Sequence, residues 1–149
     1  MKVWKQPLSV LVVIHTAALD VLLLERAAHP GLWQSVTGSR EGEEALNVTA
    51  RREVFEETAI AAHSGILTDW KISNRYEIFP TWRHRYAPGV TENTEYVFAL
   101  CLPERIKIQI SPDEHRACCW LPWAEAAERC FSWSNRDAIR LLGRRQSAA

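Results

Sequence analysis

The sequence predicts an α/β fold in which a mixed β-sheet lies between helices. Several short apolar runs, rich in β-branched residues, are spaced along the chain and bounded by turn-forming residues. A helical periodicity is inserted after the first of these runs, from Glu43 onward, and two further helical patterns follow the last run. Strands with helices inserted and appended are typical of a sheet that helices cover on its faces.

Length and charge indicate one domain with a local recognition site. A chain of 149 residues forms one domain of ordinary size, here 1–149, with a real core. Its 18 basic and 18 acidic residues cancel, so no overall field favours a nucleic acid polymer or a membrane surface. The apolar run from Leu8 to Ile14 is too short to span a bilayer and lacks a cleavage site. We therefore expect a cytoplasmic protein; nothing in the sequence indicates its oligomeric state.

The N-terminal third predicts three segments of the sheet. Leu8 to His15 reads as a buried strand, with Pro7 at its first position. Val21 to Leu24 is a second apolar run close behind it, so the two are expected to pair as a hairpin. After the loop signal His29-Pro30-Gly31, Leu32 to Gly38 carries the chain back into the sheet.

The helix that begins near Glu43 concentrates acidic charge. One face is apolar every fourth residue, at Leu46, Ala50 and Val54. Three carboxylates, Glu53, Glu56 and Glu57, are spaced at i, i+3 and i+4, so they share another face of the helix. These like charges repel, and they lie near the negative end of the helix dipole, so a hard divalent cation would relieve both penalties. The alternative is a solvated acidic face in which Arg52 pairs with Glu56.

The C-terminal half alternates strands with a basic loop and two helices. The predicted strands are Ile66 to Phe79 as a long strand or hairpin, Thr94 to Leu102, Ile106 to Ile110 and Cys118 to Leu121. One helix starts at Pro122 and runs to about Cys130. Ser134 or Asn135 is expected to cap the last helix, with Gly143 near its end and a polar tail from Arg144.

The segment from Trp82 to Gly89 interleaves basic and aromatic residues. It carries Arg83, His84 and Arg85 between two aromatic side chains. Such a loop can bind phosphates by charge and a flat ring by stacking. The alternative is a solvated turn whose aromatic residues close the edge of the core.

A longer motif spans the acidic helix. It begins with Gly38, has Glu44 after five further residues and, after seven more, the run Arg52-Glu53-Val54-Phe55-Glu56-Glu57; Ala59 and Ile60 follow after one residue. This spacing resembles the Nudix box, Gx5Ex7REUxEExGU, where U is aliphatic. Every charged position matches; the one departure is Ala59, where the box has glycine. The resemblance implies an α/β/α sandwich with a mixed sheet and a Mg²⁺-dependent pyrophosphohydrolase, with Mn²⁺ as a substitute.

Flanking motifs narrow the resemblance. The segments PLSVLVVI, WQSVTGS, YEIF, RHRYAPGVTENTE and SWSNR are similar to the Nudix branch that hydrolyses dihydroneopterin triphosphate to the monophosphate and pyrophosphate in bacterial folate synthesis. The alternatives are a broader nucleoside triphosphate pyrophosphatase, since purines are also flat hydrogen-bonding rings, and a non-catalytic Nudix domain that only binds a nucleotide or a partner.

The resemblance also implies roles for individual residues. Glu53, Glu57 and the loop acid Glu114 match metal ligands, and Glu56 adds to this catalytic cluster; on chemistry alone, Asp113 is an equal candidate to Glu114. The residues that match contacts to a small triphosphate substrate are Lys5, Arg26, Thr37, Tyr76, Glu77, Ile78, Phe79 and Ser132, and charge adds Arg83 and Arg85 to them. Each also has a plain structural interpretation, as a solvated strand end, a core aromatic or a helix-entry residue. Trp33 and Trp133 are expected to serve packing.

Overall fold

The computed structural model describes residues 3–147 and confirms the mixed α/β architecture. Its strands are β1 (Leu8–Thr16), β2 (Asp20–Arg26), β3 (Trp33–Gln34), β4 (Val36–Ser39), β5 (Ile66–Glu77), β6 (Glu92–Leu102) and β7 (His115–Pro122). Its α-helices are α1 (Leu46–Thr58), α2 (Trp123–Arg129) and α3 (Trp133–Ser147), and two 3₁₀ helices are η1 (Ala62–Ser64) and η2 (Pro80–Arg85).

Strand β1 lies at the centre of the seven-stranded sheet that residues 3–147 form. It runs parallel to β6 along its whole length and antiparallel to β4 and β2 on its other side. The expected hairpin of β1 and β2 is confirmed by the pairing of His15 with Val21. A strand with neighbours on both sides and helices above and below is apolar throughout, which explains the unbroken run in the sequence.

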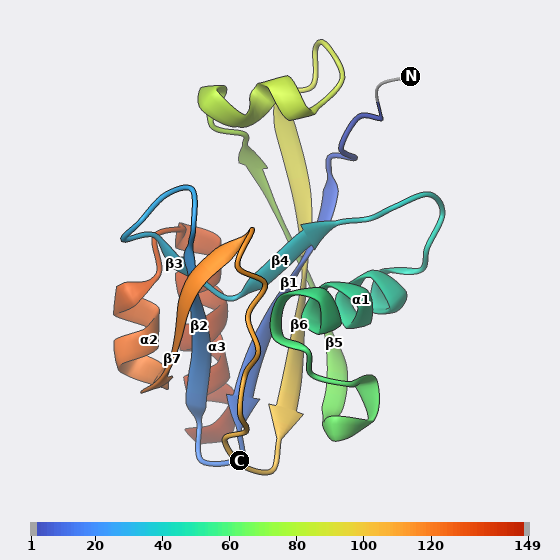
Figure 1. The fold of residues 1–149 in the computed structure, drawn as a ribbon. Helices are drawn as coiled ribbons and strands as arrows, with labels where there is room; N and C mark the ends of the chain where they lie inside the picture. Colours follow the sequence, from blue (N-terminus) through green and yellow to red (C-terminus); the bar gives the residue numbers. More distant parts are fainter. Residues whose placement is uncertain (1–2, 148–149) are drawn as a thin grey trace.

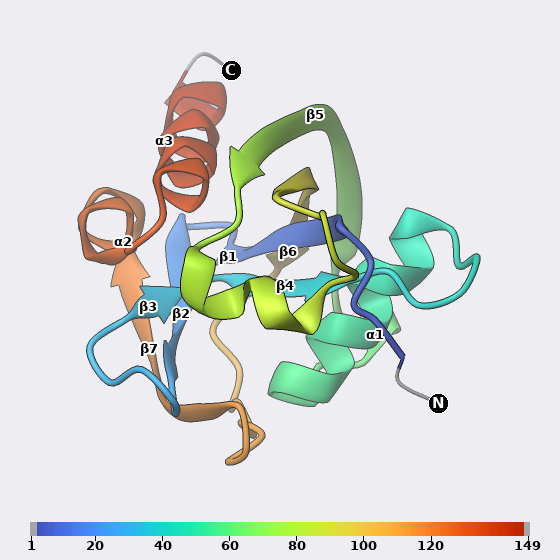
Figure 2. The same cartoon turned by 90° about the horizontal axis from the view of Figure 1, so that it is seen from above.

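The two faces of the sheet carry separate halves of the core. Leu11 and Val13 of β1 pack on the side of α2 and α3, whereas the alternate residues Val10 and Val12 pack with Ala50 of α1. Figures 1 and 2 show α1 on one side of the sheet and α2 with α3 on the other. The predicted α/β/α sandwich is therefore confirmed.

One predicted strand is wrong. Residues 106–110 form no strand, although Ile106, Ile108 and Ile110 are half-buried against the core beside α1 and alternate with exposed residues. The segment contacts the end of α1, where the Gln109 N–H donates to the Thr58 carbonyl at 3.1 Å. Burial on one face produced the alternation, but no neighbouring strand supplies a hydrogen-bonding ladder.

The ends of the helices also differ from the expectation. Helix α1 begins at Leu46, three residues after Glu43. Ser132 caps α3 in place of Ser134 or Asn135, because its hydroxyl accepts the Asn135 N–H at 3.2 Å. Helix α3 continues to Ser147, so the described part of the expected polar tail is helical.

Gly143 lies in α3 four residues before Ser147, where the helix ends. A Cβ atom there would lie 2.5 Å from the ring of Trp123, so the glycine permits close packing between α3 and α2. Every helix within residues 3–147 is too short or too polar to cross a bilayer.

Candidate active site

Helix α1 separates its three carboxylates by burial. Ala50 and Val54 hold the helix on the sheet, which turns Glu53 and Glu57 inward. Glu53 is 9% exposed and Glu57 only 1%, whereas the Glu56 side chain keeps 47% of its surface exposed. The acidic face predicted from the spacing therefore consists of two buried carboxylates and one at the surface.

Gly38 of β4 makes room for Glu53. A Cβ atom at position 38 would lie 2.0 Å from the Glu53 carboxyl carbon and 2.4 Å from both of its oxygens. Any side chain would therefore displace this carboxylate. Close approach to a carboxylate is the physical reason for the glycine at the start of the motif.

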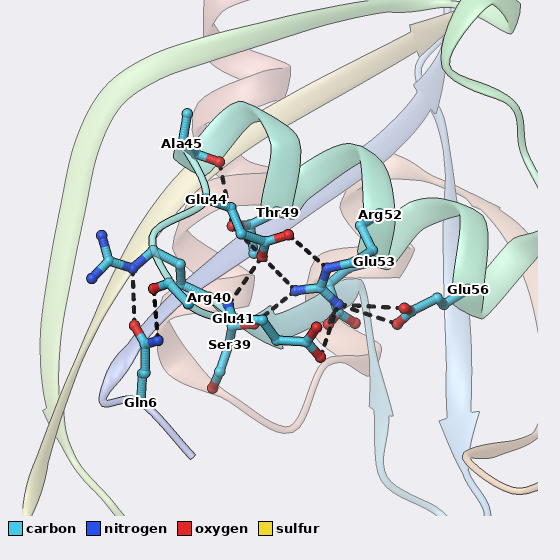
Figure 3. Close-up of polar contacts among 11 residues, drawn as sticks. Gln6, Ser39, Arg40, Glu41, Glu44, Ala45, Thr49, Arg52, Glu53 and Glu56 are labelled. Atoms are coloured by element: carbon cyan, nitrogen blue, oxygen red, sulfur yellow. Dashed lines mark hydrogen bonds and ion pairs between the residues drawn. The ribbon is translucent and has the colours of Figure 1, made fainter. Parts of the chain in front are cut away.

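Arg52 connects the loop before α1 to the acidic face (Figure 3). Its Nη2 donates to Glu44 Oε1 at 2.7 Å and to the Ser39 carbonyl at 3.0 Å. Its Nη1 donates to Glu53 Oε1 at 2.8 Å and, at longer distance, to Glu56 at 3.3 Å. The Arg52–Glu56 pair considered in the alternative interpretation is present, but it is the weaker part of a larger network that orients Glu53.

This network also holds Glu44 ionised. Hydrogen bonds from Arg52 lower the pKa of Glu44 to about 2, and the same bonds raise the pKa of Arg52. Arg52 and Glu44 therefore hold the loop before α1 against the helix, whereas Glu53 and Glu57 face inward.

Glu57 is buried without a hydrogen-bond donor. Neither of its carboxylate oxygens has a partner, and the nearest basic atom is His115 Nε2, 3.7 Å from Oε1. Burial raises the pKa of Glu57 well above its usual range, and the charges of Glu53 and Glu114 add to this effect. Burial likewise raises the pKa of Glu53. Two adjacent buried carboxylates, of which Glu57 lacks any donor, fit the ligand set of a divalent cation.

Glu114 approaches the same place from the loop before β7. It precedes β7, and its backbone is held by hydrogen bonds to Ser111 and Ala27. Ligand atoms of Glu57, Glu114 and His115 lie within 4.8 Å of one another. This geometry distinguishes Glu114 from Asp113, which is not part of that group.

His115 is a member of this group that the sequence interpretation missed. Burial, followed by the charge of Arg26, lowers its pKa to about 4, so the imidazole is neutral near pH 7. The signal for it in the sequence was only its position next to Glu114 at the start of a strand.

Three cations border the acidic cluster. Lys5, Arg26 and Arg85 line a cavity of about 330 Å³. Burial lowers the pKa of Lys5 and of Arg26, and the positive charge of Arg85 lowers both further, while Glu57 opposes these shifts. Several cations held close together attract an anion with several negative charges. Because the carboxylate cluster lies beside them, a metal ion could bind there together with the anion.

The cavity collects most of the predicted substrate residues. Its lining includes Lys5, Arg26, Thr37, Tyr76, Glu77, Ile78, Phe79, Arg85 and Ser132. Arg83 is placed elsewhere: its Nε donates to the Ile78 carbonyl at 3.0 Å, and its guanidinium pairs with Glu77. Glu77 neutralises the charge of Arg83, whereas Arg85 lines the cavity. The positive charge of the two residues in the sequence could not distinguish these positions.

Aromatic rings form one side of the cavity. Trp82, in the short helix η2, contacts Phe79 and Phe131 at ring-centroid distances of 5.1 and 6.4 Å. The guanidinium of Arg26 lies 4.7 Å from the Trp82 ring centroid. Trp33 packs on the core as expected, but Trp133 lines the cavity and is 49% exposed, so the packing expectation for Trp133 was wrong.

Two buried polar residues of β6 were also missed. Asn93 and Glu95 line the cavity and are only 2% and 4% exposed. Both occupy inward positions of a strand whose later inward residues, Val97 and Ala99, are apolar. Polar residues at core-facing positions are unusual, and this break in the alternation was the available signal.

Comparison with known proteins agrees with this geometry. The dihydroneopterin triphosphate diphosphatases of Escherichia coli K12 and Haemophilus influenzae are 48% and 41% identical to the chain. The alignments cover 93% and 92% of this chain, and 93% and 87% of those proteins.

The fold is also similar to those of solved structures. The E. coli dihydroneopterin triphosphate pyrophosphohydrolase superimposes with a TM-score of 0.87 at 47% identity, over 94% of this chain and 97% of that one. A Listeria monocytogenes NUDIX hydrolase gives 0.81 at 26% identity over 96% of both chains. The NUDIX domain model matches residues 5–142. Because this match spans most of the sequence and contains the acidic helix and both sides of the cavity, the chain belongs to the NUDIX family.

Proposed function

We propose that this chain hydrolyses dihydroneopterin triphosphate to dihydroneopterin monophosphate and pyrophosphate, with Mg²⁺ as its cofactor. The observation that supports this most directly is that a carboxylate cluster lies close enough to act on the pKa of cations that line a ring-sized cavity. The similarity to diphosphatases of that substrate along most of the chain supports the same assignment.

Glu53, Glu57 and Glu114 would hold Mg²⁺, and Mn²⁺ would substitute. The oxygens of Glu57 have no other partner, and carboxylate oxygens are the ligands that hard divalent cations prefer. When bound, the ion neutralises phosphate charge and lowers the pKa of a bound water. Without it, the burial of Glu57 and Glu53 side by side costs stability, which is the expected cost of a preformed metal site.

The remaining charged residues act on the substrate and the proton. Lys5, Arg26 and Arg85 bind the non-bridging oxygens of the triphosphate and align it against the cluster. Glu56 is the carboxylate of α1 that stays exposed, and we assign the proton of the attacking water to its oxygens.

The aromatic side of the cavity holds the ring. Phe79 and Trp82 present apolar ring surface, and Thr37 and Ser132 supply hydroxyl groups at the same cavity. A partly apolar cavity with a few polar groups selects for a flat heterocycle and orients it.

An assay of the purified protein tests this function. Pterin and purine triphosphates are compared by kcat/KM with Mg²⁺ and with EDTA, and the phosphate products are identified. We expect Mg²⁺-dependent release of pyrophosphate and the highest kcat/KM for dihydroneopterin triphosphate. An equal or higher value for a purine nucleotide would favour a broader pyrophosphatase, and binding without turnover would favour a non-catalytic nucleotide-binding domain.

A further inference from the structure

The cavity contains two buried acceptors that lack a donor. Asn93 Oδ1 and Glu95 Oε1 are inaccessible to solvent and have no hydrogen-bond partner among the described residues. Both side chains line the cavity and are more than nine-tenths buried. Neither lies in the carboxylate cluster of α1, and neither has a role in the hydrolysis described above.

The surrounding hydrogen bonds fix which atoms are free. The Asn93 amide nitrogen donates to Ser9 Oγ at 2.8 Å and to Tyr76 Oη at 2.9 Å, which uses both of its N–H groups. The Tyr76 hydroxyl in turn donates to Glu95 Oε2 at 3.4 Å. The network therefore runs from Asn93 through Tyr76 to Glu95, and it leaves one oxygen at each end without a donor.

These free acceptors are unfavourable unless a donor reaches them. A buried acceptor without a donor loses its hydration and gains nothing in return. Burial raises the pKa of Glu95 above its usual value, and the hydrogen bonds from Ser134 and Tyr76 only partly oppose this. A ligand that supplies N–H donors would satisfy both oxygens.

We infer that Glu95 and Asn93 recognise the donor edge of a 2-amino-4-oxopyrimidine ring, as found in pterins and guanine. This edge carries a ring N–H beside an exocyclic amino group, so it presents adjacent N–H donors to the free oxygens of Glu95 and Asn93. Adenine instead presents a lone pair beside its amino group, and that lone pair would face the carboxylate. The inference deepens the proposed function by assigning the residues that choose the ring.

Binding of the ring alone tests the inference apart from hydrolysis. The probe is 7,8-dihydroneopterin without phosphates, titrated without metal by calorimetry against wild-type protein and Glu95→Gln. The control is Glu92→Gln, an exposed glutamate of the same strand that does not line the cavity. Hydrogen bonds to a buried charge predict that Glu95→Gln weakens binding about 10- to 100-fold. The control should bind as the wild type does.

A change in the ligand provides a second test that needs no variant. Wild-type protein should bind the 2-oxo analogue of dihydroneopterin at least about tenfold more weakly, because an acceptor then faces Glu95. This comparison decides the matter if Glu95→Gln does not fold.

The outcomes separate this inference from the proposed function. Ring binding that depends on Glu95 and on the 2-amino group would support the inference even if the wild type hydrolysed no pterin triphosphate. Conversely, the inference is overturned if the triphosphate is hydrolysed but Glu95→Gln and the 2-oxo analogue bind like their references. Failure of wild-type protein to bind the ring would overturn it as well.

Discussion

Glu57 shows at the scale of one residue how a binding site destabilises the fold that carries it. The side chain is 1% exposed, has no hydrogen-bond donor and lies beside other carboxylates. Its spacing with Glu53 and Glu56 predicted a shared acidic face, but not that two of the three would be buried. Spacing along a helix gives the direction of a side chain relative to its neighbours, whereas burial depends on what the rest of the chain places above it.

Substitution Glu57→Gln should therefore separate stability from activity. The raised pKa of Glu57 means that its ionised form is disfavoured in the folded protein, so the cost is absent below its usual pKa of 4.5 and grows as pH rises toward the folded value. Metal-free Glu57→Gln should melt above the wild type at pH 8, and the gain should shrink toward pH 5.

Activity should change in the opposite direction. Loss of a metal ligand worth several kcal/mol should lower kcat/KM with Mg²⁺ by at least about a hundredfold. Melts and kinetics of Glu57→Gln are compared with those of the exposed Glu43→Gln, which should resemble the wild type in both. A variant that melts earlier at pH 8 yet keeps full activity would contradict the assignment.

Gly38 offers a second test at this scale. The atoms that an added Cβ would meet belong to the end of the Glu53 side chain, which can rotate away. Gly38→Ala should therefore keep its melting temperature while its Mg²⁺ activation weakens about tenfold or more, because Glu53 is misplaced. By contrast, Gly65→Ala meets the Cys101 carbonyl at 2.5 Å and should lower the melting temperature. Unchanged Mg²⁺ activation in Gly38→Ala would show that Glu53 need not occupy this position.

At the scale of elements, α1 shows which parts of a motif are structural. Arg52 and Glu44 hold the loop to the helix, and Ala59 ends it in the left-handed conformation at φ 63°, with its N–H bonded to Phe55. Alanine thus takes the place of the glycine in the motif and keeps the same turn, at a cost of roughly 1 kcal/mol. The departure that the sequence shows at Ala59 leaves the positions of the glutamates intact.

The pKa of Glu44 predicts how this contact between Arg52 and Glu44 responds to acid. Its folded pKa of about 2 lies below the usual 4.5, so its ionised form stabilises the fold above pH 4.5, and this contribution is lost as pH falls through about 2. In urea unfolding, Glu44→Gln should be less stable than the wild type at pH 6, and the difference should shrink as pH falls below 4.5 and become small only near pH 2. A difference that is independent of pH would mean that Arg52 does not act through the charge of Glu44.

The strands show the limit of periodicity. The run in β1 was recognised because burial on both faces leaves no polar positions, and β6 was recognised for the same reason along most of its length. Residues 106–110 have the alternation of a strand but no partner. Pairing is a property of two segments, so a pattern in one segment cannot establish it.

At the scale of the whole molecule, the site combines segments from both ends of the chain. Lys5 precedes β1, Ser132 precedes α3, and the aromatic helix η2 lies between β5 and β6. The resemblance to the Nudix family predicted most of these residues, because a residue can be matched to a family motif without knowing which residues surround it in the fold. His115, Asn93 and Glu95 were missed because only the folded chain shows that their buried atoms lack partners.

Glu114 gives the clearest test of this long-range assembly. It reaches the cluster from the loop before β7, within 4.8 Å of Glu57 and His115, and Asp113 is its neighbour in sequence but not part of that group. Glu114→Ala should therefore raise the Mg²⁺ concentration for half-maximal activity, or lower kcat, about tenfold or more, whereas Asp113→Ala should change either by less than about twofold.

Magnesium titrations of both variants check this, with melts without metal as the control for folding. Removing Glu114 also removes a charge that raises the pKa of Glu57, so metal-free Glu114→Ala should melt no lower than the wild type. If Asp113→Ala loses Mg²⁺ activation while Glu114→Ala keeps it, the loop delivers the other carboxylate, and the metal site must be built around Asp113.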